Sequence, residues 1–149
     1  MTLYLDNCVF NRPFDDQKQI RIKIESLAKL YIQDKIKKSG YKLIWSDILE
    51  FENDNNPHKE RTQAIEKWKN IATIYVPLTA DIQDYANDIT KYGIKPKDAL
   101  HVASSISTNA DYFITTDDGL LKKINKSGKI IALNPIDFLQ VIQNDSEHN

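Results

Sequence analysis

Short, mostly apolar runs recur along the chain and are separated by longer segments with a different pattern. The runs predict five strands, at residues 2–5, 43–45, 71–76, 112–116 and 129–133. Neighbouring positions within a run are apolar, whereas a strand with one face in water alternates apolar and polar residues. Continuous runs of this kind are typical of a parallel sheet that is covered on both faces.

The segments between the runs have the periodicity of helices. The first has five apolar residues at helical spacing, with charge on its other face, before a stop at residues 39–40: Ile20, Ile24, Leu27, Leu30 and Tyr31. Further helices are predicted after Asp47, at residues 59–70, 80–91 and 96–107, and after residues 134–135. Strands that alternate with helices predict one α/β domain at residues 1–142, followed by a polar tail at 143–149.

Composition narrows the class of protein further. The chain has 149 residues, 41% of them hydrophobic and 28% charged, which suits one globular domain with a single core. The longest wholly apolar run is far shorter than the ~20 residues of a membrane span, and no secretory signal is visible at the N-terminus. The single cysteine, Cys8, fits a reducing cytoplasm. With one Cys and three His, any metal has to be held by oxygen atoms.

Charge is segregated along the chain although the net charge is only −1. Residues 18–42 carry eight basic residues against two acids, and residues 47–60 carry five acids and one lysine. A second basic run, residues 122–129, follows the pair Asp117-Asp118. Such segregation can place an anionic polymer beside an acidic pocket. Lysine-rich helices that are simply solvated are the alternative.

Two of the predicted strands run into an acid, Asp6 in one case and Asp117 in the other. Ligand sites of open parallel sheets lie beyond the carboxyl ends of the strands, so the two acids meet there if their strands are neighbours. Asp117 is also a plausible helix N-cap. Asp98 stands in the first turn of a predicted helix, where an acid interacts favourably with the helix dipole. His101 follows three residues later, and its simplest role is packing or a hydrogen bond to Asp98.

Two nearby glutamates have different expected roles. If Asp47 is the N-cap of its helix, Glu50 occupies the third helical position and completes a pair like a capping box. Glu52 follows Ile48 by four positions and Leu49 by three, on the stripe that should face the core. Acids rarely point inward without a partner. Glu50 is therefore the structural candidate and Glu52 the functional one.

Four segments in order resemble the PIN-domain nuclease family, which includes the VapC-like ribonuclease toxins: residues 5–16, 46–52, 98–103 and 110–118. The resemblance covers nearly the whole chain. It implies a three-layer α/β/α sandwich whose parallel five-stranded sheet has the order 3-2-1-4-5. It also implies that the family's catalytic and metal-binding acids correspond to Asp6, Glu52, Asp98 and Asp117, with Asp118 as a looser match. Asn7 stands where many members have Thr or Ser.

The resemblance further implies an activity. Clustered carboxylates repel each other unless a hard cation such as Mg²⁺ or Mn²⁺ lies among them. The implied reaction is endonucleolytic phosphodiester hydrolysis in single-stranded RNA that leaves a 5′-phosphate. Five basic residues are candidates for contacts with the RNA backbone: Arg12, Lys18, Lys95, Lys97 and Lys122. Many relatives are toxins that a co-encoded antitoxin neutralises, and they act as homodimers.

The sequence also bears on three alternative functions. A protein that keeps the fold but only binds RNA or a partner, without cleaving anything, is the main alternative; the four retained acids argue against it. A phosphatase of the haloacid dehalogenase type requires a second acid where this chain has Cys8. A response-regulator receiver has its phosphorylated aspartate after the third strand, where residues 76–78 offer none.

Overall fold

Five parallel strands form one sheet in the order β3-β2-β1-β4-β5, as the motifs predicted. A computed structural model describes residues 1–148. The strands are β1 (Thr2–Leu5), β2 (Lys42–Ser46), β3 (Ile74–Val76), β4 (Tyr112–Ile114) and β5 (Ile131–Leu133). β1 is central: its Leu3 is in register with Leu43 on β2 and with Tyr112 on β4. This order makes β4 the neighbour of β1, so the residues that follow these two strands lie side by side.

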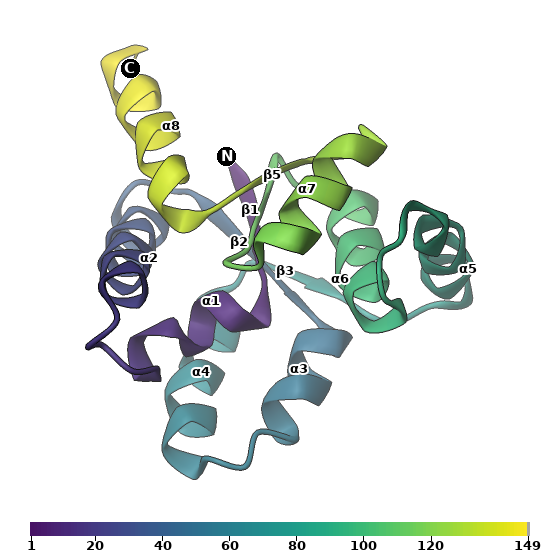
Figure 1. Ribbon diagram of the computed structural model, residues 1–149, viewed down its shortest axis with the longest axis horizontal. Coiled ribbons are helices and arrows are strands. Elements are labelled where there is room, and N and C mark those ends of the chain that lie inside the picture. Colours follow the sequence, from purple (N-terminus) through teal and green to yellow (C-terminus); the bar gives the residue numbers. More distant parts are fainter. Residues whose placement is uncertain (149) are drawn as a thin grey trace.

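Helices cover both faces of the sheet, which gives the three-layer α/β/α architecture (Figure 1). They are α1 (Asn7–Asn11), α2 (Ile20–Lys38), α3 (Asp47–Asp54), α4 (Lys59–Ile71), α5 (Ala80–Ile89), α6 (Pro96–Ser107), α7 (Asp118–Ser127) and α8 (Pro135–His148). Two 3₁₀ turns lie at Arg12–Phe14 and Thr90–Tyr92. In Figure 1, α2 and α8 lie together on one side of the sheet, and α5 packs beside α6 on the other.

The core is built on the central strands. Leu3 and Tyr4 of β1 and Phe113 of β4 are fully buried, and the Tyr4 ring stacks on the Phe113 ring at 5.3 Å between centroids. Burying a large apolar side chain is worth roughly 1.5–3 kcal/mol, so these strands hold the sheet together. A rigid sheet in turn fixes the positions at which β1 and β4 end.

Helix α2 turns a different face to the core from the one its apolar stripe marks in the sequence. The five stripe residues are all exposed: Ile20, Ile24, Leu27, Leu30 and Tyr31. Its buried face instead includes Ile32 and Ile36 together with the polar residues Glu25 and Lys29. The helix ends at Lys38 as predicted, two residues before a glycine with φ +76°. Polar partners inside the protein therefore decide how this helix is rotated.

Three helices differ from what the sequence pattern predicted. α1 was not predicted, because five residues are too few to reveal a helical period, and α7 was indicated only by Asp117 as its N-cap. α8 is longer than the predicted short helix and continues to His148, so residues 143–148, expected as a polar tail, are helical; Asn149 lies outside the described residues. Among residues 1–148, no helix has the length and hydropathy required to cross a membrane.

Candidate functional site

Asp6 lies where β1 ends, and the neighbouring elements hold its carboxylate in place. One oxygen, Oδ1, accepts a hydrogen bond from the backbone N–H of Asn7 at 2.8 Å and so caps α1. The other, Oδ2, accepts from the hydroxyl of Thr115 at 2.9 Å, just beyond β4, and from the thiol of Cys8 at 3.4 Å. Burial, with the charge of Asp6, raises the pKa of Cys8 to about 12, so the thiol stays protonated and acts as a donor.

Glu52 turns inward from α3 toward the same place. Its Oε1 is hydrogen-bonded to Nε2 of His101, and Asn7 Nδ2 donates to its Oε2 at 3.4 Å. His101 Nε2 is also 4.0 Å from Oδ1 of Asp6. Burial alone lowers the pKa of His101, but the bond to Glu52 and the charges of Asp6, Glu52 and Asp98 outweigh it, so the pKa is raised. The histidine is buried and packs against Tyr4, one of its two expected roles, but it hydrogen-bonds to Glu52 rather than to Asp98.

Asp98, in the first turn of α6, and Asp117, ahead of α7, line one pocket of about 150 Å³. Asp117 is the N-cap of α7, as predicted: its Oδ1 accepts from the N–H of Leu120 at 3.1 Å. Burial raises the pKa of Asp98, and the charges of Asp6, Asp117 and Glu52 raise it further. The charges of the other three acids thus all reach Asp98.

Asp118 lies beside this pocket but already has a partner. Its two carboxylate oxygens each accept a hydrogen bond of 2.7 Å from the guanidinium of Arg21 on α2. This two-point pairing lowers the pKa of Asp118 and neutralises its charge. Asp118, the looser of the sequence matches, therefore forms an ion pair that joins α7 to α2.

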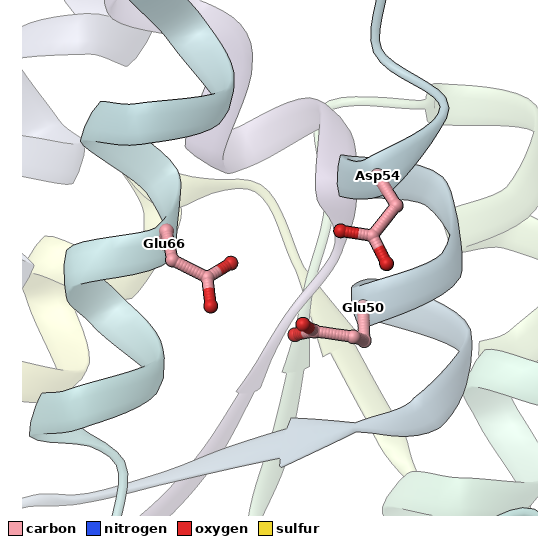
Figure 2. Close-up of side chains that lie close together, drawn as sticks. All are labelled: Glu50, Asp54 and Glu66. Carbon is pink, nitrogen blue, oxygen red and sulfur yellow. The ribbon is translucent and has the colours of Figure 1, made fainter.

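A separate group of acids lies between α3 and α4. Figure 2 shows the carboxyl groups of Glu50 and Asp54 facing Glu66 on the neighbouring helix. Oxygens of these three lie within 4.8 Å of one another, a spacing that no other group of three His, Cys, Asp or Glu side chains reaches within residues 1–148. The ammonium of Lys69 is 3.1 Å from Glu50 and 3.7 Å from Glu66. A cation of the protein itself therefore already offsets part of the negative charge of this group, at Glu50 and Glu66.

The predicted structural role of Glu50 rests on different contacts from those expected. Ser46, not Asp47, is the N-cap of α3, because its Oγ accepts from the N–H of Leu49. Glu50 accepts a hydrogen bond of 2.8 Å from the indole of Trp45 and pairs with Lys69. Glu50 and Glu52 thus leave the helix in different directions, Glu50 toward α4 and Glu52 toward Asp6.

The basic residues singled out in the sequence differ in how free they are. Arg12 pairs with Glu25 at 2.9 Å and with Asp15 at 3.2 Å, so its charge is already engaged. The other four are exposed: Lys18, Lys95, Lys97 and Lys122. Lys95 lines the pocket of Asp98 and Asp117, and so does Lys123, which belongs to the second basic run.

Two solved structures contain chains that are similar in fold to this protein. The structure of VapBC2 from Rickettsia felis, bound to a DNA fragment from its promoter, contains a chain that matches with a TM-score of 0.57 and 16% identity, over 90% of this chain and 98% of that one. A chain of VapBC-1 from nontypeable Haemophilus influenzae matches with a TM-score of 0.57 and 18% identity, over 91% and 98%. No protein-family model and no curated protein matches the sequence. The chain therefore has a PIN-like α/β/α fold.

Proposed function

We propose that this protein is an endoribonuclease that depends on Mg²⁺ or Mn²⁺. The observation that carries the proposal is the convergence of four acids from four parts of the chain: Asp6, Glu52, Asp98 and Asp117. Asp6 and Glu52 meet at His101, and Asp98 and Asp117 line one pocket. Carboxylates that act on one another in this way occur together where a function requires them, because their mutual repulsion destabilises the fold.

The chemistry of these donors suits a hard divalent cation. Carboxylate oxygens are the ligands that Mg²⁺ and Mn²⁺ prefer. Burial is the main cause of the raised pKa of Asp98, and the charges of the other three acids add a repulsion that a cation would relieve. An ion held by Asp6, Glu52, Asp98 and Asp117 would lower the pKa of a bound water and neutralise charge on a scissile phosphate. Asp118 is left out of this set because Arg21 already holds both of its oxygens.

Residues around the acids have supporting roles in this proposal. Thr115 and Cys8 fix the orientation of the Asp6 carboxylate, so this side chain does not have to become ordered when a ligand binds. Lys95 and Lys123 border the pocket and are placed to contact the phosphates of a single-stranded RNA. Cleavage would leave a 5′-phosphate, as in the family that the sequence motifs resemble.

We further propose that the protein works with protein partners. The two matched structures are VapBC complexes, which favours the toxin of a toxin–antitoxin pair for this chain, with a co-encoded antitoxin as its partner. The apolar side chains exposed on α2 favour a surface that another protein chain covers, such as an antitoxin or the second copy in a homodimer. Sedimentation velocity over a range of concentrations tests the homodimer.

The substitution Asp6→Asn tests the nuclease proposal. It removes a ligand charge but keeps the shape and the hydrogen-bond acceptor that caps α1, so the fold should survive while turnover falls by orders of magnitude. Cleavage of single-stranded RNA by the wild type should stop in EDTA and return with Mg²⁺ or Mn²⁺. Highly purified Asp6→Asn protein that cleaves at the wild-type rate would show that the site is assigned wrongly.

The control is Asp118→Asn, which changes the adjacent acid outside the proposed set. It breaks the ion pair with Arg21 but should leave cleavage within a small factor of the wild type. If the wild type binds RNA but never cleaves it, with any divalent ion, the protein is an RNA-binding module that keeps the fold without the chemistry.

A further inference from the structure

A chain of buried polar groups leads from the protein core to Glu52. The hydroxyl of Tyr4 lies 2.7 Å from Ser46 Oγ and 2.6 Å from His101 Nδ1, and the other ring nitrogen of His101 bonds to Glu52 Oε1. Tyr4 and Ser46 are fully buried, and His101 is 1% exposed. Three elements therefore meet at the histidine: β1 through Tyr4, α3 through Glu52, and α6, which carries the ring itself.

The donors and acceptors of this chain fit together in one direction. An ionised Glu52 only accepts, so a neutral His101 ring donates from Nε2 and its Nδ1 accepts from the hydroxyl of Tyr4. The oxygen of Tyr4 then accepts from the hydroxyl of Ser46, whose own oxygen accepts from the N–H of Leu49. Every group in the chain has a partner, and the tautomer of His101 is fixed by its neighbours.

We propose that His101 is a positioning residue for the metal site, which holds Oε1 of Glu52 so that the carboxylate faces Asp6. This inference rests on the proposed metal-dependent function. Glutamate has a long, flexible side chain, and only some of its rotamers reach Asp6 from α3. The hydrogen bond to His101 selects one of them before any ion binds, and Asn7 meets the other oxygen, Oε2, from the opposite element. Partners behind a metal ligand act on metal affinity in this way.

A purely structural role for His101 gives a different expectation. The ring packs edge-on against Tyr4, with centroids 5.7 Å apart, so its loss destabilises the core in either case. A structural histidine leaves the affinity of the folded protein for metal unchanged, whereas a positioning histidine alters it. Metal affinity and stability, measured separately, therefore distinguish the two roles.

Two substitutions divide the functions of the ring between them. In His101→Gln the amide nitrogen can take the place of Nε2 and donate to Glu52, but nothing replaces Nδ1. In His101→Asn the amide oxygen can take the place of Nδ1 and accept from Tyr4, but Glu52 loses its donor. We expect Mn²⁺ affinity, measured by calorimetric titration, to fall about 10- to 100-fold in His101→Asn and to stay close to the wild type in His101→Gln.

Equal affinities in the two variants would overturn the inference, whether both match the wild type or both are weakened alike. Urea unfolding of each variant shows whether it is folded under the conditions of the titration. If the wild type itself binds no Mn²⁺, the proposed metal-dependent function is wrong and the inference falls with it. Normal binding by the wild type and by His101→Asn overturns the inference alone.

The substitution Tyr4→Phe tests the same chain without altering the imidazole. It removes the hydroxyl that fixes the tautomer but keeps the ring that stacks on Phe113. The ¹⁵N NMR shifts of His101, recorded without metal at a pH above the pKa of the ring, should show the Nε2–H tautomer in the wild type and a mixture in Tyr4→Phe. A wild-type ring with its proton on Nδ1 would overturn the inference even if the His101 variants do not fold.

Discussion

Glu50 and Glu52 are two positions apart on α3, and their surroundings differ in what each carboxylate meets. Glu50 faces two donors, the indole of Trp45 and the ammonium of Lys69, and the ammonium balances its charge. Glu52 faces His101 and Asn7, and lies near a second carboxylate, that of Asp6. Residues two apart on a helix point in nearly opposite directions, so these surroundings follow from the register of α3.

The matched substitutions Glu50→Gln and Glu52→Gln test this division. Glu52→Gln should weaken Mn²⁺ binding and RNA cleavage with little loss of stability, because it removes a negative charge from a cluster of acids. Glu50→Gln should stay active and lose about 1 kcal/mol of stability through its weaker bond to Trp45. Metal titration, cleavage assays and urea unfolding of both proteins provide the comparison. Activity lost at Glu50 but kept at Glu52 would mean that the site lies between α3 and α4.

Lys29 is a buried lysine whose amine contacts Gln33 at 2.9 Å and lies over the ring of Trp68. Burial, with the nearby charge of Lys37, lowers its pKa from 10.5 to about 8. Between these two pH values the unfolded chain binds more protons than the native protein, so this lysine makes stability rise with pH. Below about pH 8 the buried charge destabilises the fold by a constant amount.

The substitution Lys29→Met keeps the apolar stem and removes the charge. It should stabilise the protein at pH 7 by up to about 3 kcal/mol, the free energy that corresponds to the lowered pKa. The advantage over the wild type should shrink as the pH rises from 8 toward 10.5. Urea unfolding at several pH values measures it, with the exposed Lys23→Met as the control. A constant difference between mutant and wild type at all pH values would contradict the assigned pKa.

At the level of elements, helix α2 gives the sharpest test of how the chain is packed. Leu27 is 58% exposed and Ile32 is fully buried, although the sequence pattern places Leu27 on the apolar stripe. Leu27→Lys should change the free energy of unfolding by no more than about 0.5 kcal/mol. Ile32→Ala should cost about 2–5 kcal/mol because it leaves a cavity. Comparable losses in the two variants, measured by urea unfolding, would mean that the stripe faces the core.

Most strands could be predicted because a buried parallel strand is apolar at nearly every position, a local signal. The rotation of α2 could not, because Glu25 is buried by its pairing with Arg12, a contact between separate elements. Its rotation therefore depends on tertiary structure. α1 was missed for a different reason, since five residues show no period.

The same distinction holds for the site. The acids at the ends of β1 and β4 could be predicted from strand-to-acid transitions, and Glu52 from its place on an inward stripe. The contact between His101 and Glu52 could not, because these residues are 49 positions apart and nothing local links them. Thr115 precedes the Asp117-Asp118 pair in the sequence, but its bond to Asp6 becomes visible only when β4 lies beside β1.

In the molecule as a whole, lysines lie at both ends of the parallel strands. Lys122 and Lys123 lie in the first turns of α7, next to Asp117 and beyond the carboxyl end of β4. Lys42 and Lys129 lie at the opposite ends of the strands, where β2 and β5 begin. If RNA binds at the acidic pocket, only the first pair contacts phosphates. The affinity of RNA then depends on salt through counterions that these lysines release, at roughly 0.7 per phosphate contact on a single strand.

Charge reversal at each pair tests this arrangement. The double variant Lys122→Glu/Lys123→Glu should weaken binding to all RNA sequences about equally and flatten the dependence of affinity on salt. The matched variant Lys42→Glu/Lys129→Glu changes the net charge by the same amount and should retain the wild-type slope. Filter-binding titrations at several salt concentrations measure both. An unchanged slope in the first variant would mean that its lysines are only surface residues.

The place of β4 beside β1 also determines when the proposed site can form on a newly made chain. Asp6 leaves the ribosome well before Thr115, whose hydroxyl orients it and which follows 109 positions later. Until then β1 pairs with β2 alone, and its other edge stays open. Because contacts so distant in sequence form late, the acids gather only after β4 has been made. Under the proposed function, a chain whose synthesis stops before β4 is therefore inactive, and nuclease activity arises only as the fold is completed.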